Sequence, residues 1–297
     1  MTDRMLTLPA VKELLEQFGA APRRSLGQNF VVDPNTVRRI ARLSGVGPGD
    51  RVVEIGAGLG SLTLALAETG AEVVAVETDG RLVPLLREVV SAFLTGCDQS
   101  AAEPGAAKPN AVQIVHADAR RMDWSALLPG SGWQVVANLP YNIATSLVLT
   151  VLDEVPAVNR LLVTCQREAA ERLAAVPGSG AYGAVSVRVA IHADAELAGA
   201  VPASVFYPRP EVESALVRVT RRAPPMEPDL HAEVNRLVTA AFAHRRQMLR
   251  RTLRGAVDDA DGALAAAGVD PTDRPERLGL DQWIGLAEVS LEARARG

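Results

Sequence analysis

Short apolar runs typical of buried strands alternate along this chain with longer amphipathic stretches typical of helices. Residues 51–58 (RVVEIGAG) form an apolar run that ends in glycines, and residues 61–70 (SLTLALAETG) have the apolar spacing of a helix. The same pair of patterns recurs in residues 71–79 and 81–94. Because strands that alternate with helices of this length form parallel βαβ units, the pattern predicts a doubly wound α/β domain.

The alternation continues towards the middle of the chain. Residues 111–118 and 133–141 predict a third and a fourth strand, and residues 142–154 a helix. Another strand and helix are expected in residues 160–173, and residues 184–201 (AVSVRVAIHADAELAGAV) are predicted to be mainly β structure. The fold class expected from this order is a Rossmann-like α/β domain.

Two interruptions divide the pattern. Residues 95–110 (TGCDQSAAEPGAAKPN) are small, polar and proline-bearing, which predicts a flexible surface loop. A second break lies at residues 221–229 (RRAPPMEPD), after which the apolar spacing is helical. We therefore expect an α/β domain over residues 1–222 and a small helical domain over residues 223–297, without internal repeats.

Composition adds exclusions rather than a function. With 48% hydrophobic and 22% charged residues, the chain resembles an ordinary soluble globular protein. Its apolar runs are too short to span a bilayer, and the N-terminus lacks the apolar core of a signal peptide, so a cytoplasmic protein without membrane contact is expected. Cys97 and Cys165 lie in unlike contexts and are interpreted as free thiols, and the four histidines show no metal-ligand spacing. No metal site is expected.

The net charge of −4 conceals clusters of cationic side chains. Residues 242–254 (FAHRRQMLRRTLR) contain five arginines and no acid, and residues 1–42 are net basic. Clustered cations matter more for phosphate binding than the global charge. Arginine far outnumbers lysine throughout the chain, so these clusters also fit a bias in genome composition, and charge alone leaves RNA binding open. The candidate RNA contacts are Arg23, Arg24, Arg245, Arg246 and Arg250.

The glycine-rich segment after the first predicted strand is a candidate cofactor loop. Gly56 and Gly58 let the backbone turn sharply and approach a ligand closely, and the following helix presents unpaired N–H groups. Such a loop also occurs in nicotinamide and flavin enzymes. The dinucleotide pattern, however, requires glycine at position 61, and this chain has Ser61.

Acidic residues end three successive predicted strands. Glu54, just before the glycines, would attract a cationic amino-acid group and repel a pyrophosphate. Glu77 is placed to accept hydrogen bonds from both ribose hydroxyls, and Asp118 from an adenine amino group. Each acid alone also fits a helix cap or a solvated loop. Together with the glycine loop they favour S-adenosylmethionine over NAD.

A polar tetrapeptide, Asn138-Leu139-Pro140-Tyr141, ends the fourth predicted strand at the same edge of the sheet. The 6-amino nitrogen of adenine is a poor nucleophile, and acceptors for its two N–H groups would help it towards tetrahedral geometry. The side-chain oxygen of Asn138 and the carbonyl of Leu139 can be those acceptors, while Pro140 stiffens the turn. Tyr141 offers a ring on which an extruded base can stack. In isolation the tetrapeptide also fits an ordinary strand-to-helix turn.

Taken together, these motifs resemble the KsgA/RsmA family of small-subunit ribosomal RNA adenine dimethyltransferases over nearly the whole chain. The matching blocks are SLGQNFVVDP (25–34), VVEIGAGLGSLT (52–63), VVAVETD (73–79), HADA (116–119), NLPYNI (138–143) and FYPRPEVESALV (206–217), and FAHRRQMLRRTLR is similar to the family's basic helix. The resemblance implies transfer of methyl groups from S-adenosylmethionine, leaving S-adenosylhomocysteine, to two adjacent adenines in a hairpin loop near the 3′ end of 16S rRNA. It also implies action on the immature 30S subunit, and we expect a monomer.

The resemblance adds residues that the spacing alone does not identify. Asn29 and Val31 would join the cofactor site, Gln28 and Phe30 would help to close it, and Phe206 would be a second stacking surface for the base. The chain departs from the family in a longer 95–110 loop and in Gln247, where lysine is common.

Three alternative functions compete with this interpretation. One is a large-subunit rRNA adenine methyltransferase of the macrolide-resistance type, which shares the glycine loop and a similar tetrapeptide. The others are a non-catalytic ribosome-assembly factor and an NAD-dependent oxidoreductase, which Ser61 disfavours.

Overall fold

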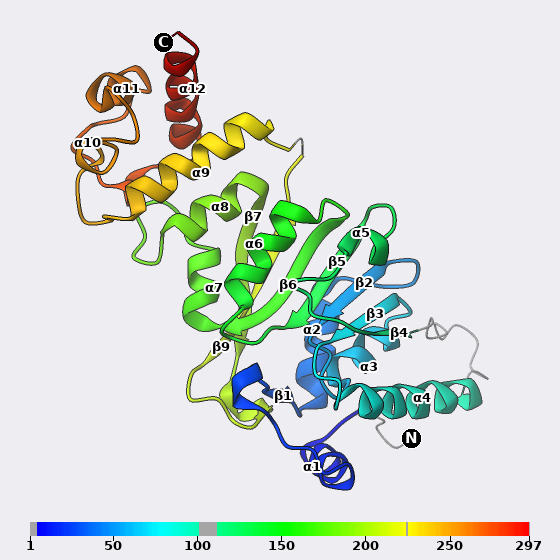
Figure 1. Ribbon diagram of the computed structural model, residues 1–297. Helices are drawn as coiled ribbons and strands as arrows, with labels where there is room; N and C mark the ends of the chain where they lie inside the picture. Colours follow the sequence, from blue (N-terminus) through cyan, green and yellow to red (C-terminus); the bar gives the residue numbers. More distant parts are fainter. Residues whose placement is uncertain (1–4, 101–111, 224, 297) are drawn as a thin grey trace. The chain divides into compact units, whose positions relative to one another are not determined.

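The computed structural model describes residues 5–100, 112–223 and 225–296, and its main element is a seven-stranded sheet (Figure 1). Along the sheet the strand order is β4-β3-β2-β5-β6-β9-β7. The strands are β2 (Arg51–Ile55), β3 (Glu72–Glu77), β4 (Val112–His116), β5 (Trp133–Asn138), β6 (Val158–Gln166), β7 (Ala193–Val201) and β9 (Ser214–Arg221). The first five of these pair in parallel, and β9 runs antiparallel to β6. The predicted α/β class is confirmed.

The strand order reverses between β2 and β5, which places the ligand-binding edge of the sheet. From β2 the chain moves outwards to β3 and β4, then returns to the other side of β2 as β5. Ligands in open α/β sheets bind at the carboxyl ends of strands beside such a reversal. The glycine loop after β2 and the tetrapeptide at the end of β5 therefore lie side by side.

Helices connect these strands and pack on the sheet. The helices of this part of the chain are α1 (Leu8–Gln17), α2 (Pro34–Ser44), α3 (Ser61–Glu68), α4 (Val83–Ser100), α5 (Trp124–Leu127), α6 (Ala144–Glu154) and α7 (Arg167–Leu173), with the 3-10 turns Arg24–Leu26 and Ala203–Val205. The helix α3 packs against β3, α4 against β4 and α6 against β6. Apart from the sheet, β1 (Phe30–Val31) pairs antiparallel with β8 (Phe206–Tyr207).

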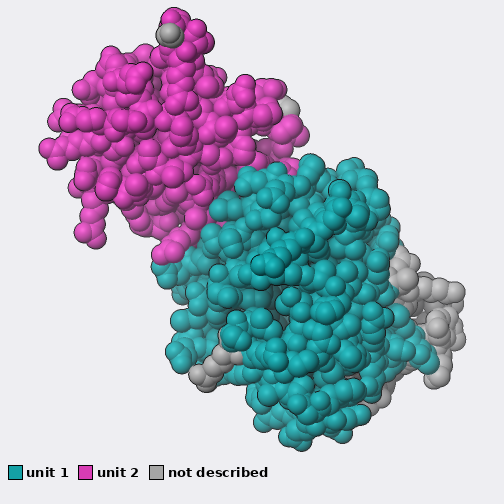
Figure 2. Space-filling view, in the orientation of Figure 1, with its two compact units in different colours: residues 1–170, 197–220 teal, residues 171–196, 221–297 magenta. Residues whose placement is uncertain are grey.

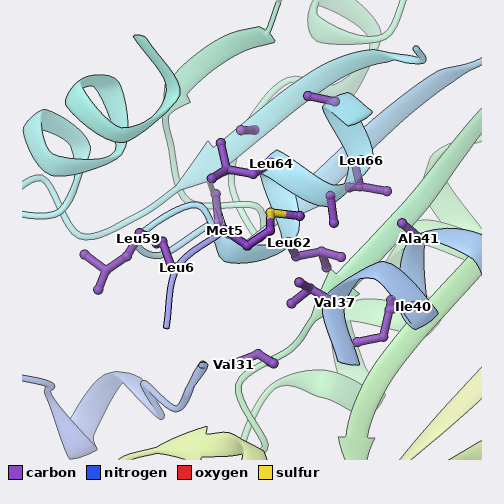
Figure 3. Close-up of a cluster of buried hydrophobic side chains, with 14 of the residues drawn as sticks. Met5, Leu6, Val31, Val37, Ile40, Ala41, Leu59, Leu62, Leu64 and Leu66 are labelled. Carbon is purple, nitrogen blue, oxygen red and sulfur yellow. The ribbon is translucent and has the colours of Figure 1, made fainter. Parts of the chain in front are cut away.

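A continuous apolar core joins the N-terminal elements to the first half of the sheet. In Figure 3, Val37 of α2 lies beside Leu62 of α3, and Met5 lies beside Leu62 and Leu64; Ile40 and Leu66 belong to the same cluster. These side chains are buried. Burial of a Leu or Ile side chain contributes about 1.5–3 kcal/mol, so the core fixes the start of α3 and with it the end of the glycine loop.

The chain forms two compact units, coloured separately in Figure 2, and each is discontinuous in sequence. Residues 1–170 and 197–220 form unit 1, and residues 171–196 and 221–297 form unit 2. The predicted division between residues 222 and 223 lies beside the return into unit 2 but misses residues 171–196. The remaining helices lie in unit 2: α8 (Ala184–His192), α9 (Pro228–Phe242), α10 (Leu249–Thr252), α11 (Ala260–Ala266) and α12 (Leu280–Arg296), with the 3-10 turn Pro275–Arg277.

Packing explains why residues 171–196 belong with the later helices. The side chains of Tyr182, Val187 and Ile191 are buried with Leu237 and Trp283 in one apolar cluster. Apolar contact between segments far apart in sequence leaves no local signal, so the composition break near residue 222 shows only one of the crossings between units.

Three local predictions are corrected. Residues 184–192 form α8 instead of β structure, because packing in the unit 2 core overrides the β preference of the valines. Residues 95–100 continue α4, and the rest of the predicted loop, residues 101–110, lies outside the described residues. The basic stretch 242–254 is the end of α9, a turn and the short α10 instead of one helix.

Of the two cysteines, Cys165 has a described side chain. Cys165 is a free, buried thiol, and burial raises its pKa to about 12. The side chain of Cys97 lies outside the described residues. In the described part of the chain, the helices are all too short or too polar to cross a membrane.

Candidate functional site

The glycine loop is built around three backbone conformations that favour glycine. Gly56, Gly58 and Gly60 have φ values of +76°, +60° and +96°. A Cβ on Gly58 would lie 3.0 Å from the Phe30 ring, and one on Gly60 2.9 Å from Leu86. Larger residues are therefore excluded by both strain and space.

Glu77 holds this loop from the end of the neighbouring strand. Its Oε2 accepts from the Gly58 N–H at 2.7 Å, and its Oε1 accepts from the Asp79 N–H at 2.7 Å. Burial raises the pKa of the Glu77 carboxyl, and the two N–H donors oppose that rise. The carboxylate lines the pocket, and its remaining lone pairs suit a vicinal diol.

Glu54 is buried more deeply, with 2% of its surface exposed, and also lines the pocket. Its Oε2 accepts from the Thr63 hydroxyl at 2.5 Å. Burial raises the pKa of Glu54 from 4.5 to about 8. Burial therefore favours the neutral form of this carboxyl, and a cation beside it would favour the carboxylate.

This pKa predicts how stability depends on pH. Between pH 4.5 and about 8 native Glu54 keeps a proton that the unfolded chain has lost. The unfolded state then binds fewer protons, so the free energy of unfolding falls as pH rises through this window. At about 1.4 kcal/mol for each pKa unit, the loss is a few kcal/mol. Denaturant unfolding of the ligand-free protein at a series of pH values measures it.

The control is Glu54→Gln, which keeps an acceptor for Thr63 and cannot ionise. The variant is expected to match the wild type near pH 5, to exceed its stability at pH 8.5 and to show a flatter profile. Parallel profiles for the two proteins would contradict the assignment.

The start of α3 offers groups for an anion. The Ser61 hydroxyl is buried, lines the pocket and has no hydrogen-bond partner among the described residues. The helix begins at Ser61 without a side-chain cap, so its first N–H groups lack intrahelical partners. An unsatisfied buried hydroxyl, free helix N–H groups and a nearby buried acid fit a ligand that carries a carboxylate and a cation. An S-adenosylmethionine amino-acid group is such a ligand.

Asn138 ends β5 with its side chain held by a segment far away in sequence. Its Nδ2 donates to the backbone oxygen of Asn29 at 2.9 Å, across 109 positions. Because the nitrogen is committed to Asn29, the oxygen Oδ1 is the atom that can accept from a ligand. Asn138 and Pro140 both line the pocket.

The other members of the tetrapeptide are fixed by their neighbours. The Leu139 N–H donates to the Thr164 carbonyl at 3.0 Å, and the Pro140 carbonyl accepts from the Ala144 N–H at 3.1 Å. The Tyr141 hydroxyl lies 2.7 Å from the Ser214 hydroxyl at the start of β9. Burial raises the pKa of Tyr141. The half-buried Tyr141 ring is thus held by strands β5 and β9.

The structure brings most predicted cofactor residues into one pocket. The predicted residues on its wall are Gln28, Asn29, Val31, Glu54, Gly56, Gly58, Glu77 and Asn138. The wall does not include Asp118, Leu139, Tyr141 or Phe206.

Asp118 is engaged with its own loop. Both of its oxygens accept from Arg120, at 3.0 Å from Nε and 2.7 Å from Nη2, and this pairing lowers the Asp118 pKa. Its carboxylate is 27% exposed, so a bound adenine would share it with Arg120.

Phe206 lies in the core instead of on an open surface. It is 3% exposed, pairs with Val31 between β1 and β8, and belongs to the apolar cluster of unit 1. In this structure its ring supports the segment beneath the pocket and offers no face to a base.

Sequence reasoning missed two polar residues beside the pocket. Asp79 accepts from Gln28 Nε2 at 3.0 Å, and Arg81 lowers the pKa of Asp79 to about 2. The Thr164 hydroxyl is buried without a hydrogen-bond partner among the described residues, and Thr164 pairs with Asn138 across β5 and β6. The acidic side chain at the end of the 73–79 block could have indicated Asp79. Nothing in the sequence indicated Thr164.

The basic residues differ in what they contact. In unit 2, Arg245 donates to Glu276 at 2.8 Å and to the Gly180 carbonyl at 2.9 Å. Arg246 is exposed and has no hydrogen bond or ion pair within the described ranges; with His244 and Arg274 it lines a surface hollow. Arg250 is exposed as well, as is Arg23 in unit 1, whereas the side chain of Arg24 lies outside the described residues.

Comparisons with known proteins agree with this geometry. The model of a family described as "Ribosomal RNA adenine dimethylase" matches residues 19–290. "Ribosomal RNA small subunit methyltransferase A" of Thermobifida fusca is 44% identical over 96% of each chain. The crystal structure of the 23S rRNA methyltransferase ErmE is 27% identical and covers 88% of this chain and 99% of its own, with a TM-score of 0.63. A dimethyladenosine transferase from Plasmodium falciparum shares the fold, at 19% identity, 89% and 97% coverage and a TM-score of 0.68.

Proposed function

This chain belongs to the ribosomal RNA adenine dimethylase family and is an S-adenosylmethionine-dependent rRNA adenine dimethyltransferase, and we propose that its targets are two adjacent adenosines in a hairpin loop near the 3′ end of 16S rRNA. The observation that carries the proposal is the Asn138 amide, fixed with its oxygen available beside the cofactor pocket. The names of the relatives at 44% and 45% identity support the small subunit as substrate.

Separate groups of residues would bind the amino-acid group, the ribose and the adenine of the cofactor. The Ser61 hydroxyl, the first N–H groups of α3 and Glu54 would hold the amino-acid group. Glu77, which already holds the glycine loop, would accept from the ribose, and Asp118, which is paired with Arg120, would accept from the adenine amino group. When bound, the cofactor supplies an activated methyl group on a sulfonium.

The protein's contribution to transfer is mainly position. Asn138 Oδ1 and the Leu139 carbonyl accept the two N–H groups of the target amine, so that its lone pair points at the methyl carbon. Transfer from the sulfonium would leave the amine with an extra proton, which would pass to water, so these residues would not need to act as a general base. Tyr141 stacks on the extruded base, with its hydroxyl anchored at Ser214. Two rounds on each adenosine give the dimethylated product.

The substrate is tested with isolated ribosomal subunits. We expect methyl incorporation into immature 30S particles from a strain without this modification, and mass mapping should locate dimethyl groups on two neighbouring adenosines of 16S rRNA. Incorporation confined to 50S particles would contradict the proposal and favour the specificity of the ErmE-like enzymes. Without turnover on either particle, an assembly-factor function would be favoured.

Arg245, Arg246 and Arg250 of unit 2 are proposed to contact rRNA phosphates, together with Arg23 and Arg24 of the basic segment 1–42. Arg246→Glu is expected to weaken binding to immature 30S particles and to reduce the slope of log affinity against log salt by about one or two. Filter binding at several salt concentrations measures both.

Arg245→Glu is the matched variant. Because Arg245 bonds to Glu276 and Gly180, its reversal should lower the melting temperature as well as affinity. Arg246→Glu should leave the melting temperature unchanged. Unchanged binding by Arg246→Glu would show that this side chain is only a solvated cation.

The remaining parts of the proposal concern context. We propose that the enzyme acts in the cytoplasm, as a monomer and without a metal ion, on 16S rRNA within the assembling 30S particle. Sedimentation of the purified protein tests whether it is a monomer, and metal analysis of the active enzyme tests whether it works without a metal ion.

A further inference from the structure

The segment of residues 26–31 forms one wall of the cofactor pocket and also holds the catalytic amide. All six residues line the pocket, and the Asn29 carbonyl accepts from Asn138 Nδ2. A Cβ on Gly27 would lie 3.0 Å from Pro140, so the segment also packs closely on the tetrapeptide. The direction of the Asn138 amide therefore depends on where this segment lies.

Gln28 ties the segment down on both sides. Its Oε1 accepts from the Arg23 N–H at 2.8 Å, and its Nε2 donates to Asp79 Oδ2 at 3.0 Å. Asp79 is 5% exposed and follows β3, where its own N–H donates to Glu77 at 2.7 Å. The pocket wall includes Glu77 and Thr78 but does not include Asp79.

These bonds form a continuous chain between the two functions of the site. It runs from the carboxylate of Glu77, which holds the glycine loop, through Asp79 and Gln28 to the Asn29 carbonyl and Asn138. We propose that the contact between Gln28 and Asp79 is a clasp that positions Asn138 for methyl transfer, with Asp79 acting as a positioning residue. The inference rests on the proposed role of Asn138 as acceptor for the target amine.

A local role for Asp79 is the alternative. Its Oδ1 accepts from the Arg81 N–H at 3.2 Å, and its carbonyl accepts from the Leu82 N–H at 2.8 Å, so Asp79 also shapes the turn before α4. Arg81 contacts the same carboxylate at 2.6 Å. A role confined to that turn affects stability and does not depend on the residue at position 28.

The first experiment separates binding from turnover. Gln28→Ala and Asp79→Ala are expected to lower kcat by about 10- to 100-fold at saturating cofactor and 30S substrate, because small displacements of a positioning group have such costs. Since Asp79 does not line the pocket, the Kd of the Asp79→Ala variant for the cofactor, measured by titration, should change much less than its kcat. Unchanged kcat in Gln28→Ala would overturn the proposal.

The second experiment tests direct contact by exchanging donor and acceptor. Gln28→Glu alone opposes two carboxylates and should reduce kcat at least as much as Gln28→Ala. In the double variant Gln28→Glu/Asp79→Asn, one oxygen at position 28 still accepts from Arg23, and the other accepts from the new amide. We expect kcat to recover by about tenfold, as for residues in direct contact. A double variant no more active than Gln28→Glu would overturn the clasp.

Two controls complete the design. Arg81→Ala removes the ion pair on Asp79 and leaves the contact with Gln28, so kcat should fall less than in Gln28→Ala. Glu68→Gln breaks the surface pair with Arg38 in the same unit and should leave kcat unchanged. An equal loss in Arg81→Ala would assign the effect to the turn and contradict the clasp.

The clasp and the proposed function fail separately. If Asn138→Ala is inactive while the Gln28 and Asp79 variants turn over normally, the clasp is wrong and the role of Asn138 stands. If Asn138→Ala remains fully active, the proposed chemistry is wrong whatever the clasp variants do.

Discussion

Replacing Asn138 by alanine is expected to lower kcat for methyl transfer by about 100- to 1,000-fold, the cost seen when one preorganised polar group aimed at a transition state is removed. The side-chain oxygen is the acceptor that the fold directs at the target amine, because Nδ2 is committed to Asn29. Cofactor binding should change little, since Glu77, the glycine loop and Ser61 keep their places. Single-turnover transfer to immature 30S particles, with cofactor titration in parallel, measures the two effects.

Variants of the same loop test the geometry. Asn138→Asp keeps an acceptor but sets an oxygen against the Asn29 carbonyl, so it should also be poorly active. Asn142→Ala, which removes an exposed amide just beyond the tetrapeptide, should keep most of the activity. Equal losses in Asn138→Ala and Asn142→Ala would contradict a specific role for the first.

The parts of the site that sequence could predict are those encoded by local chemistry. Positive φ at Gly56, Gly58 and Gly60 requires glycine, and the strand patterns place Glu77 and Asn138 at carboxyl ends that meet beside the reversal between β2 and β5. Strand periodicity and residue type were sufficient for these positions.

Side-chain partners could not be predicted in the same way. The bond between Asn138 and Asn29 crosses 109 positions, and the one between Gln28 and Asp79 crosses 51. Such contacts depend on how segments fold back on one another.

The sequence also did not predict which side chains are buried in elements whose local conformational preference conflicts with their packing. Phe206 was expected at the site on the strength of a family block, yet its ring is covered by the β1–β8 pair and the core around it. Residues 184–192 carry β-branched side chains and still form a helix, because Val187 and Ile191 then share one face buried in unit 2. In both cases tertiary contacts outweighed the local signal.

Glu77→Gln is expected to be the most damaging isosteric change in the cofactor site. Both oxygens of Glu77 accept from backbone N–H groups, on Gly58 and Asp79, and a glutamine must turn its NH₂ towards one of them. An unsatisfied buried donor costs about 1–3 kcal/mol, which corresponds to about 5- to 150-fold weaker cofactor binding if the loop shifts to relieve it. Calorimetric titration measures the affinity, and Glu72→Gln at the exposed start of the same strand is the matched control. Because Glu77 accepts from the Asp79 N–H at the start of the hydrogen-bond chain to Asn138, kcat at saturating cofactor should fall as well. A change in affinity alone would mean that Glu77 holds the ribose without influence on Asn138.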